Sequence, residues 1–302
     1  MRSDNHPPSP VVIGEVLFDQ FEDGSRVLGG APFNVAWHLH GLGLRPRFIS
    51  AVGADADGDC ILQRMEDAGM DTRYVQRVDE KATGAVNVRV TDGSPSYEIL
   101  EDRAWDSLDY HPLEESDATA LLYHGSLACR GEHNRAVIER WRQEWPGMVL
   151  FDANLRPPHY TVQRVNDLTR NVRWMKLNEE ELVELCAEGE FDFGDAEPHA
   201  QSYLERYNAH GLALTGGKEG AAVITRDASA KISPAPKPEP MVDTVGAGDS
   251  FTAAFIFGLL QGWPLQTIVE RASGFACRIC QQQGAIPDNP NLYYHVLSTW
   301  NA

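Results

Sequence analysis

The sequence predicts an α/β fold: a doubly wound parallel sheet with helices on both faces, accompanied by a small second β-sheet. Short apolar runs alternate with amphipathic helical segments over most of the chain, as expected when a crossover helix follows each strand. The alternation is interrupted between residues 84 and 102, where apolar and polar side chains alternate with the period of a half-buried strand. The 302 residues suffice for one large α/β domain with a minor sheet.

The first quarter of the chain is predicted to form strand, helix, strand and helix. An apolar strand is expected at residues 11–16, and a helix at residues 32–43, where apolar residues recur at helical spacing before closing glycines. A second strand follows at residues 47–53 and a second helix at residues 57–69. This order is typical of adjacent parallel strands joined by helices.

The small second sheet is predicted from a hairpin. Residues 84–102 alternate around Asp92 and Gly93, a dipeptide that favours a tight turn between antiparallel strands. We expect strand material from residues 17–28 to join this hairpin outside the main sheet.

From Ala120 onward, strands and helices alternate again. A proline-rich link at residues 234–240 precedes a segment of small residues and two last helices. Strands are predicted at residues 121–125, 148–154, 174–178 and 211–217, helices at residues 134–145 and 179–186, and a further hairpin at residues 221–234.

The charge of the chain argues against two classes of partner. Its 44 acidic and 26 basic residues give a net charge of −18, which repels nucleic acid and anionic membranes. No apolar run approaches the roughly 20 residues that span a bilayer. The N-terminal segment also lacks the apolar core of a signal peptide. We therefore expect a cytoplasmic protein that binds neither nucleic acid nor membranes.

The five cysteines are predicted to be free thiols. Their number is odd and most are far apart in the sequence, which suits a reducing compartment better than a disulfide framework. Cys277 and Cys280 form a C-x-x-C pair in a predicted helix, without a second pair of ligands nearby. This pattern favours a buried helix face over a metal or redox site.

The segment DTVGAGDSFTAAF, residues 243–255, carries the strongest chemical signal. Apolar residues on one helical face begin just after Gly248, so Gly246, Ala247 and Gly248 lie at a helix N-terminus, where backbone amides can approach an anion. Asp249 at the same end could accept a proton from a hydroxyl that attacks phosphorus. The alternative is a helix cap with tight packing.

This segment resembles the C-terminal signature of the ribokinase-like (PfkB-type) sugar kinases. GGAPFNVA at residues 29–36 is similar to their N-terminal signature, NEEE at residues 178–181 to their N-x-x-E motif, and TGGKEGA at residues 215–221 to their nucleotide-side glycine turn. The matches occur in family order and cover essentially the whole chain. The resemblance implies one kinase domain, residues 1–302, with a β-sheet lid at about residues 17–28 and 84–108 that closes over the sugar.

The resemblance also implies how phosphoryl transfer is catalysed. Asp249 would be the general base, and the amides of Gly246, Ala247 and Gly248 the anion hole for the γ-phosphate of ATP. Mg²⁺ would be held near Asn178 and Glu181, largely through water. The alternative for Glu181 is an acidic first-turn residue that is favourable to the helix dipole.

Further binding residues follow from the resemblance. Arg156 is expected either to contact a phosphate or sugar hydroxyl, or to form an ion pair with Asp152. A monovalent cation, K⁺, binds in several relatives, and whether it binds this chain is left open. The implied sugar contacts are Asp19, Gly29, Gly30, Asn34, Asp152, Asn154 and Arg156; the nucleotide contacts are Asn178, Thr215, Gly217, Gly220 and Ser273; and the K⁺ ligands are Asp243 and the carbonyl of Val245.

The substrate implied by the motifs GEVLFDQF, GGAPFNVAWHL and DANLRP is fructose, because their combination is most similar to bacterial fructokinases. Ribose, 2-keto-3-deoxygluconate or another sugar remains an alternative, and a non-catalytic sugar or nucleotide sensor is a further one. The chain has neither a P-loop motif nor G-x-G-x-x-G in this segment. Relatives often dimerise through the lid, so a homodimer is expected, with Tyr97 and Trp105 as lid-edge contacts or as core residues.

Overall fold

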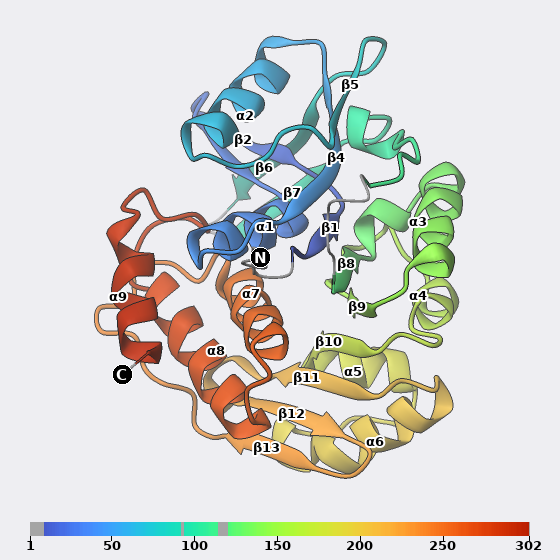
Figure 1. The fold of residues 1–302 in the computed structure, drawn as a ribbon, viewed down its shortest axis with the longest axis vertical. Helices are drawn as coiled ribbons and strands as arrows, with labels where there is room; N and C mark the ends of the chain where they lie inside the picture. Colours follow the sequence, from blue (N-terminus) through green and yellow to red (C-terminus); the bar gives the residue numbers. More distant parts are fainter. Residues whose placement is uncertain (1–8, 92–93, 114–119, 302) are drawn as a thin grey trace, which may run out of the picture.

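A nine-stranded sheet forms the centre of the molecule (Figure 1). The computed structural model describes residues 9–91, 94–113 and 120–301. The strands of this sheet lie in the order β13-β12-β11-β10-β9-β8-β1-β4-β5. They are β1 (Val11–Ile13), β4 (Arg47–Gly53), β5 (Val75–Val78), β8 (Leu121–Gly125), β9 (Met148–Asp152), β10 (Trp174–Asn178), β11 (Gly211–Thr215), β12 (Ala221–Thr225) and β13 (Ser229–Ile232).

All neighbouring strands from β5 to β11 are parallel, whereas β12 and β13 add an antiparallel hairpin at one edge. The register places Val12 between Phe48 and Tyr123, near the middle of the sheet. Parallel strands must be connected by crossovers, because a tight turn cannot join them. The predicted doubly wound parallel sheet is therefore confirmed.

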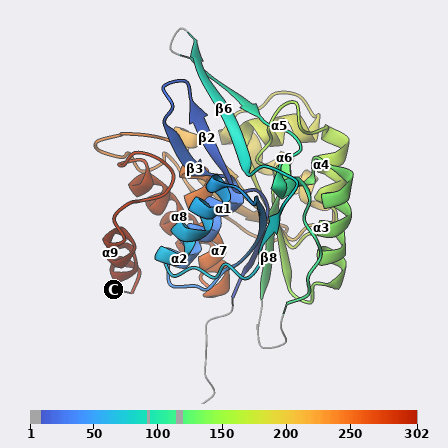
Figure 2. The ribbon, with the colours of Figure 1, turned by 90° about the horizontal axis from the view of Figure 1, so that it is seen from above.

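Helices cover both faces of this sheet (Figure 2). On one side lie α1, α2, α7, α8 and α9, and on the other α3, α4, α5 and α6. Two separate clusters of buried apolar side chains match the two faces: Val12 and Leu150 belong to one, while Ile13 and Phe151, their neighbours in sequence, belong to the other. The helices are α1 (Ala31–Gly41), α2 (Ala56–Asp67), α3 (Glu132–Glu144), α4 (Val162–Leu168), α5 (Glu179–Cys186), α6 (Ala196–Arg206), α7 (Ala247–Leu260), α8 (Leu265–Ile279) and α9 (Asn291–Trp300).

A second, four-stranded sheet projects from one end of the main sheet (Figure 2). Its order is β3-β2-β6-β7, with β2 (Leu17–Phe21), β3 (Arg26–Gly29), β6 (Gly84–Thr91) and β7 (Ser94–Ile99). Leu17, Val86 and Val88 form a small apolar cluster of their own. The predicted second sheet is thus present; the predicted turn at Asp92 and Gly93 lies outside the described residues.

The strand predicted at residues 11–16 is shorter in the structure, and residues 14–16 connect the two sheets. β1 ends at Ile13, and the chain enters β2 of the second sheet at Leu17. Glycine at position 14 allows the chain to leave the main sheet here, since a Cβ would lie 2.3 Å from Cγ of Pro32. This short connection brings the second sheet against the carboxyl end of β1.

The cysteines are free thiols, as expected. Cys277 lies in α8, and Cys280 is the residue that caps its C-terminus. Burial raises the pKa of both thiols, so neither has thiolate character. Among the described residues, no helix is both long and apolar enough to cross a membrane.

Candidate active site

The N-terminus of α7 is fixed by a glycine and by packing. Gly246, the N-cap, has φ +77°, in the left-handed region that favours glycine. A Cβ at this position would lie 2.4 Å from Cβ of Ala285, so a larger side chain has no room. Beyond the first turn, Phe251, Ala254 and Phe255 are buried in the core. The end of the helix therefore cannot shift without disturbing the interior.

Three backbone amides are free at this helix end. Within the described chain, the amides of Gly246, Gly248 and Asp249 donate no hydrogen bond, whereas that of Ala247 donates to the Thr244 carbonyl at 3.2 Å. The resemblance to the sugar kinases implies an anion hole made by the amides of Gly246, Ala247 and Gly248. The structure leaves the Asp249 amide free in place of that of Ala247, because the turn that starts the helix uses the latter. Free amides at a helix N-terminus favour an anion there.

Asp249 stands at this helix end and is held by a side chain from another part of the chain. Nδ2 of Asn34, a buried residue of α1, donates to Oδ2 of Asp249 at 2.8 Å. Oδ1 of Asn34 is buried and has no partner. Burial raises the pKa of Asp249, and this effect outweighs the opposing effects of the Asn34 hydrogen bond and of the positive charges of Lys176 and Arg156. A carboxylate with a raised pKa is suited to accept a proton.

A buried ion pair lies beneath Asp249. Nζ of Lys176 is 3.4 Å from Oδ1 of Asp152, whose side chain is 1% exposed, and Oγ1 of Thr252 donates to Oδ2 of Asp152 at 3.1 Å. Gly248 lies directly above, because a Cβ at that position would be 3.7 Å from Nζ of Lys176. The structure thus places Asp152 underneath the site, paired with Lys176 rather than with Arg156.

The charges of this buried group depend on one another. Burial by itself would lower the pKa of Lys176, but the carboxylates of Asp152, Glu181 and Asp249 outweigh burial and raise it, so the ammonium is charged. Burial raises the pKa of Asp152 to about 6, although Lys176 opposes the increase. The ammonium group of Lys176 therefore interacts with three carboxylates, those of Asp152, Glu181 and Asp249.

The second sheet brings Asp19 and the predicted glycine pair to the same region. Burial raises the pKa of Asp19 to about 6, against the effect of Arg156. A Cβ at Gly29 would lie 3.7 Å from Oδ2 of Asp19. Gly30, the N-cap of α1, has φ +109°, and a Cβ there would lie 2.7 Å from the carbonyl oxygen of Glu15. Gly30 thus allows the start of α1 to pass close to the backbone between β1 and β2, whereas Gly29 lies in ordinary contact with Asp19.

The loop after β9 carries Asn154 and Arg156. Asn154 has φ +38°, which bends the chain just beyond the strand. Arg156 is exposed and donates to its neighbouring carbonyl, that of Leu155, at 3.0 Å. Its positive charge acts on Glu15, Asp19 and Asp249, which belong to three different segments. Arg156 therefore lies within electrostatic range of both Asp249 and Asp19.

Asn178 and Glu181 form a capping box at the start of α5. Oδ1 of Asn178 accepts from the Glu181 amide at 2.7 Å, and Glu181 accepts from the amides of Asn178 and Leu155, each at 2.8 Å. Each carboxylate oxygen keeps a second lone pair, which can accept a hydrogen bond from metal-bound water. Among the described residues, no group of three or more His, Cys, Asp or Glu could hold a metal directly. These residues fit Mg²⁺ held through water, the mode that this ion favours.

The predicted nucleotide residues lie at the neighbouring strand end. Thr215 pairs with Asn178 across β10 and β11. Gly217 and Gly220 follow, with φ +54° and +127°, and a Cβ at Gly220 would lie 1.9 Å from the Ile232 carbonyl oxygen. Ser273 lies on α8, where its buried hydroxyl has no partner. No hydrogen bond or ion pair among the described residues connects these groups to Asp249.

The predicted cation ligands are located just before α7. Oδ1 of Asp243 accepts from the Val245 amide at 3.0 Å, and Oδ2 accepts from the Gly284 amide at 2.9 Å. The Cys280 carbonyl also accepts from the Asp243 amide at 3.3 Å. Asp243 therefore ties the loop before α7 to the segment after α8.

Sequence reasoning missed two charged residues of the site. Glu15 is 3% exposed, and burial raises its pKa to about 7, against the opposing effect of Arg156. Lys176 is the cation of the buried pair. Both interrupt apolar strand runs, VVIGEV and WMKLN, and a charge in such a run is the signal that could have found them.

Comparisons with known proteins find relatives that match most of the chain. A family model described as pfkB family carbohydrate kinase matches residues 13–292. The fructokinase of Salmonella typhimurium is 30% identical over 263 residues, which cover 82% of this chain and 83% of that protein. The 2-dehydro-3-deoxygluconokinase of Bacillus subtilis is 28% identical over 283 residues, covering 88% and 84%. A solved fructokinase double mutant from Vibrio cholerae, with fructose, ADP and a potassium ion bound, has a TM-score of 0.78 at 25% identity and covers 98% of this chain and 100% of that one.

Proposed function

Because the chain belongs to the pfkB family of carbohydrate kinases, we propose that it is an ATP-dependent fructokinase, which forms fructose 6-phosphate. One observation carries the proposal: the carboxylate of Asp249 stands at a helix N-terminus that has three free amides. A proton acceptor and an anion site are the two elements that phosphoryl transfer to an alcohol requires.

Asp249 removes the proton from the primary hydroxyl as its oxygen attacks the γ-phosphorus of ATP. The amides of Gly246, Gly248 and Asp249 stabilise the negative charge on the phosphoryl oxygens during transfer. Lys176, directly beneath Gly248, adds a positive charge to the same end of the helix. Asn34 orients the carboxylate through its hydrogen bond to Oδ2, which leaves Oδ1 for the substrate.

The sugar is held by groups from the second sheet and from the loop after β9. Asp19, Asn154 and Arg156 can bind several hydroxyls of a ketohexose, and Gly29 and Gly30 let the ring approach the backbone. The second sheet acts as a lid that excludes water from the phosphoryl group. Val27 and Tyr97 expose 43% and 59% of their surface on this sheet, which supports a homodimer through the lid, whereas Trp105 is fully buried and belongs to the core.

Nucleotide and metal binding complete the proposed site. Thr215, Gly217, Gly220 and Ser273 flank ATP, and Asn178 and Glu181 hold the waters of Mg²⁺, which neutralises phosphate charge when bound. The solved Vibrio cholerae fructokinase contains ADP and a potassium ion. Asp243 and the Val245 carbonyl are the corresponding groups for K⁺ in this chain.

The relative from Bacillus subtilis supports a second candidate substrate, 2-keto-3-deoxygluconate. This sugar carries a carboxylate, and Arg156 is an exposed cation close to the sugar side. Fructose has no charge, and Arg156 would act on it only as a hydrogen-bond donor to a hydroxyl. The two substrates therefore differ in how strongly they should depend on Arg156.

A sugar panel distinguishes these functions. Fructose, ribose, 2-keto-3-deoxygluconate and fructose 6-phosphate are each incubated with the protein, ATP and Mg²⁺, and ADP release is measured. We expect the highest kcat/KM with fructose. A higher value for another sugar would replace fructose as the substrate, and inactivity with all sugars despite ATP binding would indicate a sensor.

Replacing Asp19 with asparagine tests the sugar side. Loss of the charge should raise KM for the sugar by about 10- to 100-fold, the usual range for a hydrogen bond to a charged group, with little change in KM for ATP. Because the pKa of Asp19 is about 6, KM for the sugar should also rise as the pH falls below that value in the native protein, but not in Asp19→Asn. A change confined to ATP affinity would contradict this placement.

Replacing Asn34 with alanine tests the orientation of the base. The Asn34 hydrogen bond lowers the pKa of Asp249, so its loss should raise that pKa. The general base is active when ionised, and the acid limb of the kcat profile should therefore move to higher pH. An unchanged acid limb with a lower kcat would show that Asn34 does not act on the ionisation of Asp249.

A further inference from the structure

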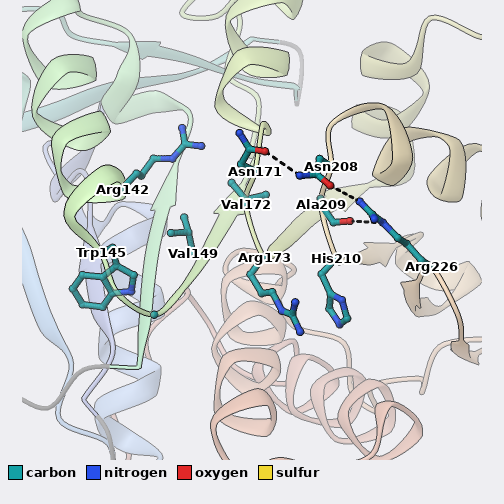
Figure 3. Close-up of a pocket in the computed structure, with 11 residues that line it drawn as sticks. Arg142, Trp145, Val149, Asn171, Val172, Arg173, Asn208, Ala209, His210 and Arg226 are labelled. Carbon is teal, nitrogen blue, oxygen red and sulfur yellow. Dashed lines mark hydrogen bonds between the residues drawn. The ribbon is translucent and has the colours of Figure 1, made fainter.

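A cavity of about 480 Å³ lies at the amino ends of three parallel strands, whereas the candidate active site lies at their carboxyl ends (Figure 3). It is lined where β9, β10 and β11 begin, at residues 147–149, 171–173 and 208–210, whereas Asp152, Asn178 and Thr215 end the same strands. A parallel strand rises about 3.3 Å per residue, so roughly 13–16 Å separates the two ends of these strands. The cavity is thus distinct from the proposed active site.

The lining of this cavity is basic, although the chain as a whole has a net charge of −18. Arg142, Arg173 and Arg226 contribute to it, and none of the lining residues is acidic. Arg142 is partly compensated, because it lies 3.2 Å from the carboxylate of Glu139. The cavity therefore gathers three arginines and no acidic lining residue on a protein that is strongly acidic.

The charges of Arg173 and Arg226 are not compensated by an ion pair within the described residues. Arg226 donates to two neutral oxygens, the Ala209 carbonyl at 3.1 Å and Oδ1 of Asn208 at 2.9 Å. The side chain of Arg173 makes no hydrogen bond to another described residue, and Figure 3 shows it beside His210, projecting to the same side. Both guanidinium groups can therefore bind an anion without first breaking an ion pair.

The cavity wall is held in place before any ligand arrives. Nδ2 of Asn208 donates to Oδ1 of Asn171 at 3.1 Å, and the Asn171 amide donates to the Tyr207 carbonyl at 3.1 Å. The Arg173 amide is likewise bound to the Val149 carbonyl at 2.9 Å. Three loops are thus tied together, and a ligand would not need to order them.

One further wall residue has an unused donor. Trp145 lines the cavity, and its Nε1 is buried without a hydrogen-bond partner. Its indole ring gives the cavity an apolar side next to Val149 and Val172. A volume of about 480 Å³ lies in the usual range for small-molecule sites and exceeds what a bare ion would fill.

We propose that this cavity is a second binding site, which takes a small phosphorylated metabolite. Guanidinium groups with planar, paired donors recognise phosphate oxygens, which accounts for Arg173 and Arg226. Nδ2 of Asn171, which donates no hydrogen bond within the described residues, suits a hydroxyl of a sugar-sized body, and Trp145 packs against its apolar face. The proposal does not depend on the substrate of the kinase, since it concerns binding alone.

His210 provides a local reporter for binding. Burial and the positive charges of Arg173 and Arg226 lower its pKa, while the exposed Asp227 has the opposite effect. A bound phosphate would offset the two arginines and should raise the pKa of His210. The NMR signal of this ring distinguishes binding here from binding at the N-terminus of α7, where Gly248 lies next to Nζ of Lys176, further along β10.

To test the proposal, the whole protein is titrated with inorganic phosphate and with glucose 6-phosphate. Binding is measured by the NMR signal of His210 and by calorimetry. We expect saturable binding that is tighter for glucose 6-phosphate, a raised pKa of His210, and at least 10-fold weaker binding in Arg173→Gln and Arg226→Gln. Arg45→Gln removes the same charge from another exposed position and should leave binding unchanged. Arg173→Gln is the cleaner variant, because this side chain makes no hydrogen bond that its replacement would break.

Two outcomes would show that no anion binds in this cavity, and a third would show that the anion is not a phosphate. One is the absence of a His210 response to either phosphate compound, and the other is binding that survives Arg173→Gln and Arg226→Gln together. Citrate, included as a phosphate-free anion, should bind more weakly than glucose 6-phosphate, and tighter binding of citrate would contradict the assignment to phosphate. If any of these expected results were not observed, the proposed kinase activity would still be tested separately by the sugar panel.

Discussion

Asp249→Asn should lower kcat by roughly 10²–10⁴-fold, the range usual for a positioned general base. The amide has almost the same shape and can still accept the hydrogen bond from Asn34, so the fold should be preserved. It cannot take a proton from the sugar hydroxyl. Steady-state kinetics with the best sugar of the panel measures the loss, and calorimetry measures ATP affinity, which should change little.

Glu205→Gln is the matched control for this substitution. Glu205 is an exposed acid on α6, and replacing it by its amide should leave kcat unchanged. If Asp249→Asn retained native turnover, Asp249 would not be the base. If it lost ATP binding to the same extent as turnover, its role would be to shape the nucleotide site.

Lys176→Met should cause the largest loss of stability. Removing the cation leaves Asp152 buried at 1% exposure without its ion-pair partner, and breaking a buried pair in this way costs about 3–5 kcal/mol of unfolding free energy. Thr252 and Tyr123 still donate to Oδ2 of Asp152, but neither carries a charge. Urea unfolding at pH 8 measures the effect.

The loss should also depend on pH, with a definite sign. Asp152 has a pKa of about 6, raised by burial, so it is ionised at pH 8 and largely protonated at pH 5. Without Lys176 its pKa should rise further, and the buried charge can then be relieved by protonation. The difference between native and variant proteins should therefore be larger at pH 8 than at pH 5, and equal values at both would contradict the account. Lys218→Met, at a position 92% exposed, should change stability by no more than about 0.5 kcal/mol.

The sequence predicted those parts of the fold in which the pattern is strong. The β4 strand, Arg47–Gly53, coincides with the predicted range, and α7 starts within a residue of the expected position. In both segments a run of apolar residues is bounded by glycine, which marks the ends clearly. The anion site was predicted for the same reason, because small residues before an apolar helix leave amides accessible.

The elements that the sequence analysis missed are short or have small apolar side chains. β5, Val75–Val78, is an edge strand of four residues, and α4, Val162–Leu168, has seven, too few for a period to be visible. α6 buries Ala196, Ala200, Tyr203 and Leu204 at helical spacing, but alanine contributes little to an apolar pattern.

Side-chain partners within the site could not be predicted, because they depend on tertiary packing. Asn34 and Asp249 are 215 positions apart, and their contact requires α1 to lie against the start of α7. The pairing of Asp152 with Lys176 arises because β9 and β10 are neighbours in parallel register, in which these two residues are partners. The sequence therefore named Asn34, Asp152 and Asp249 as candidates, but it could not predict the hydrogen bonds and ion pairs that these residues make.

The most direct test of the central claim is a crystal structure with ADP, Mg²⁺, aluminium fluoride as a mimic of the transferring phosphoryl group, and the best sugar of the panel. The account predicts that fluorine atoms lie within about 3.2 Å of the amides of Gly246, Gly248 and Asp249, and that a primary hydroxyl of the sugar donates to the Asp249 carboxylate. A fluoride group that binds away from these amides, or a sugar hydroxyl that does not reach Asp249, would contradict it.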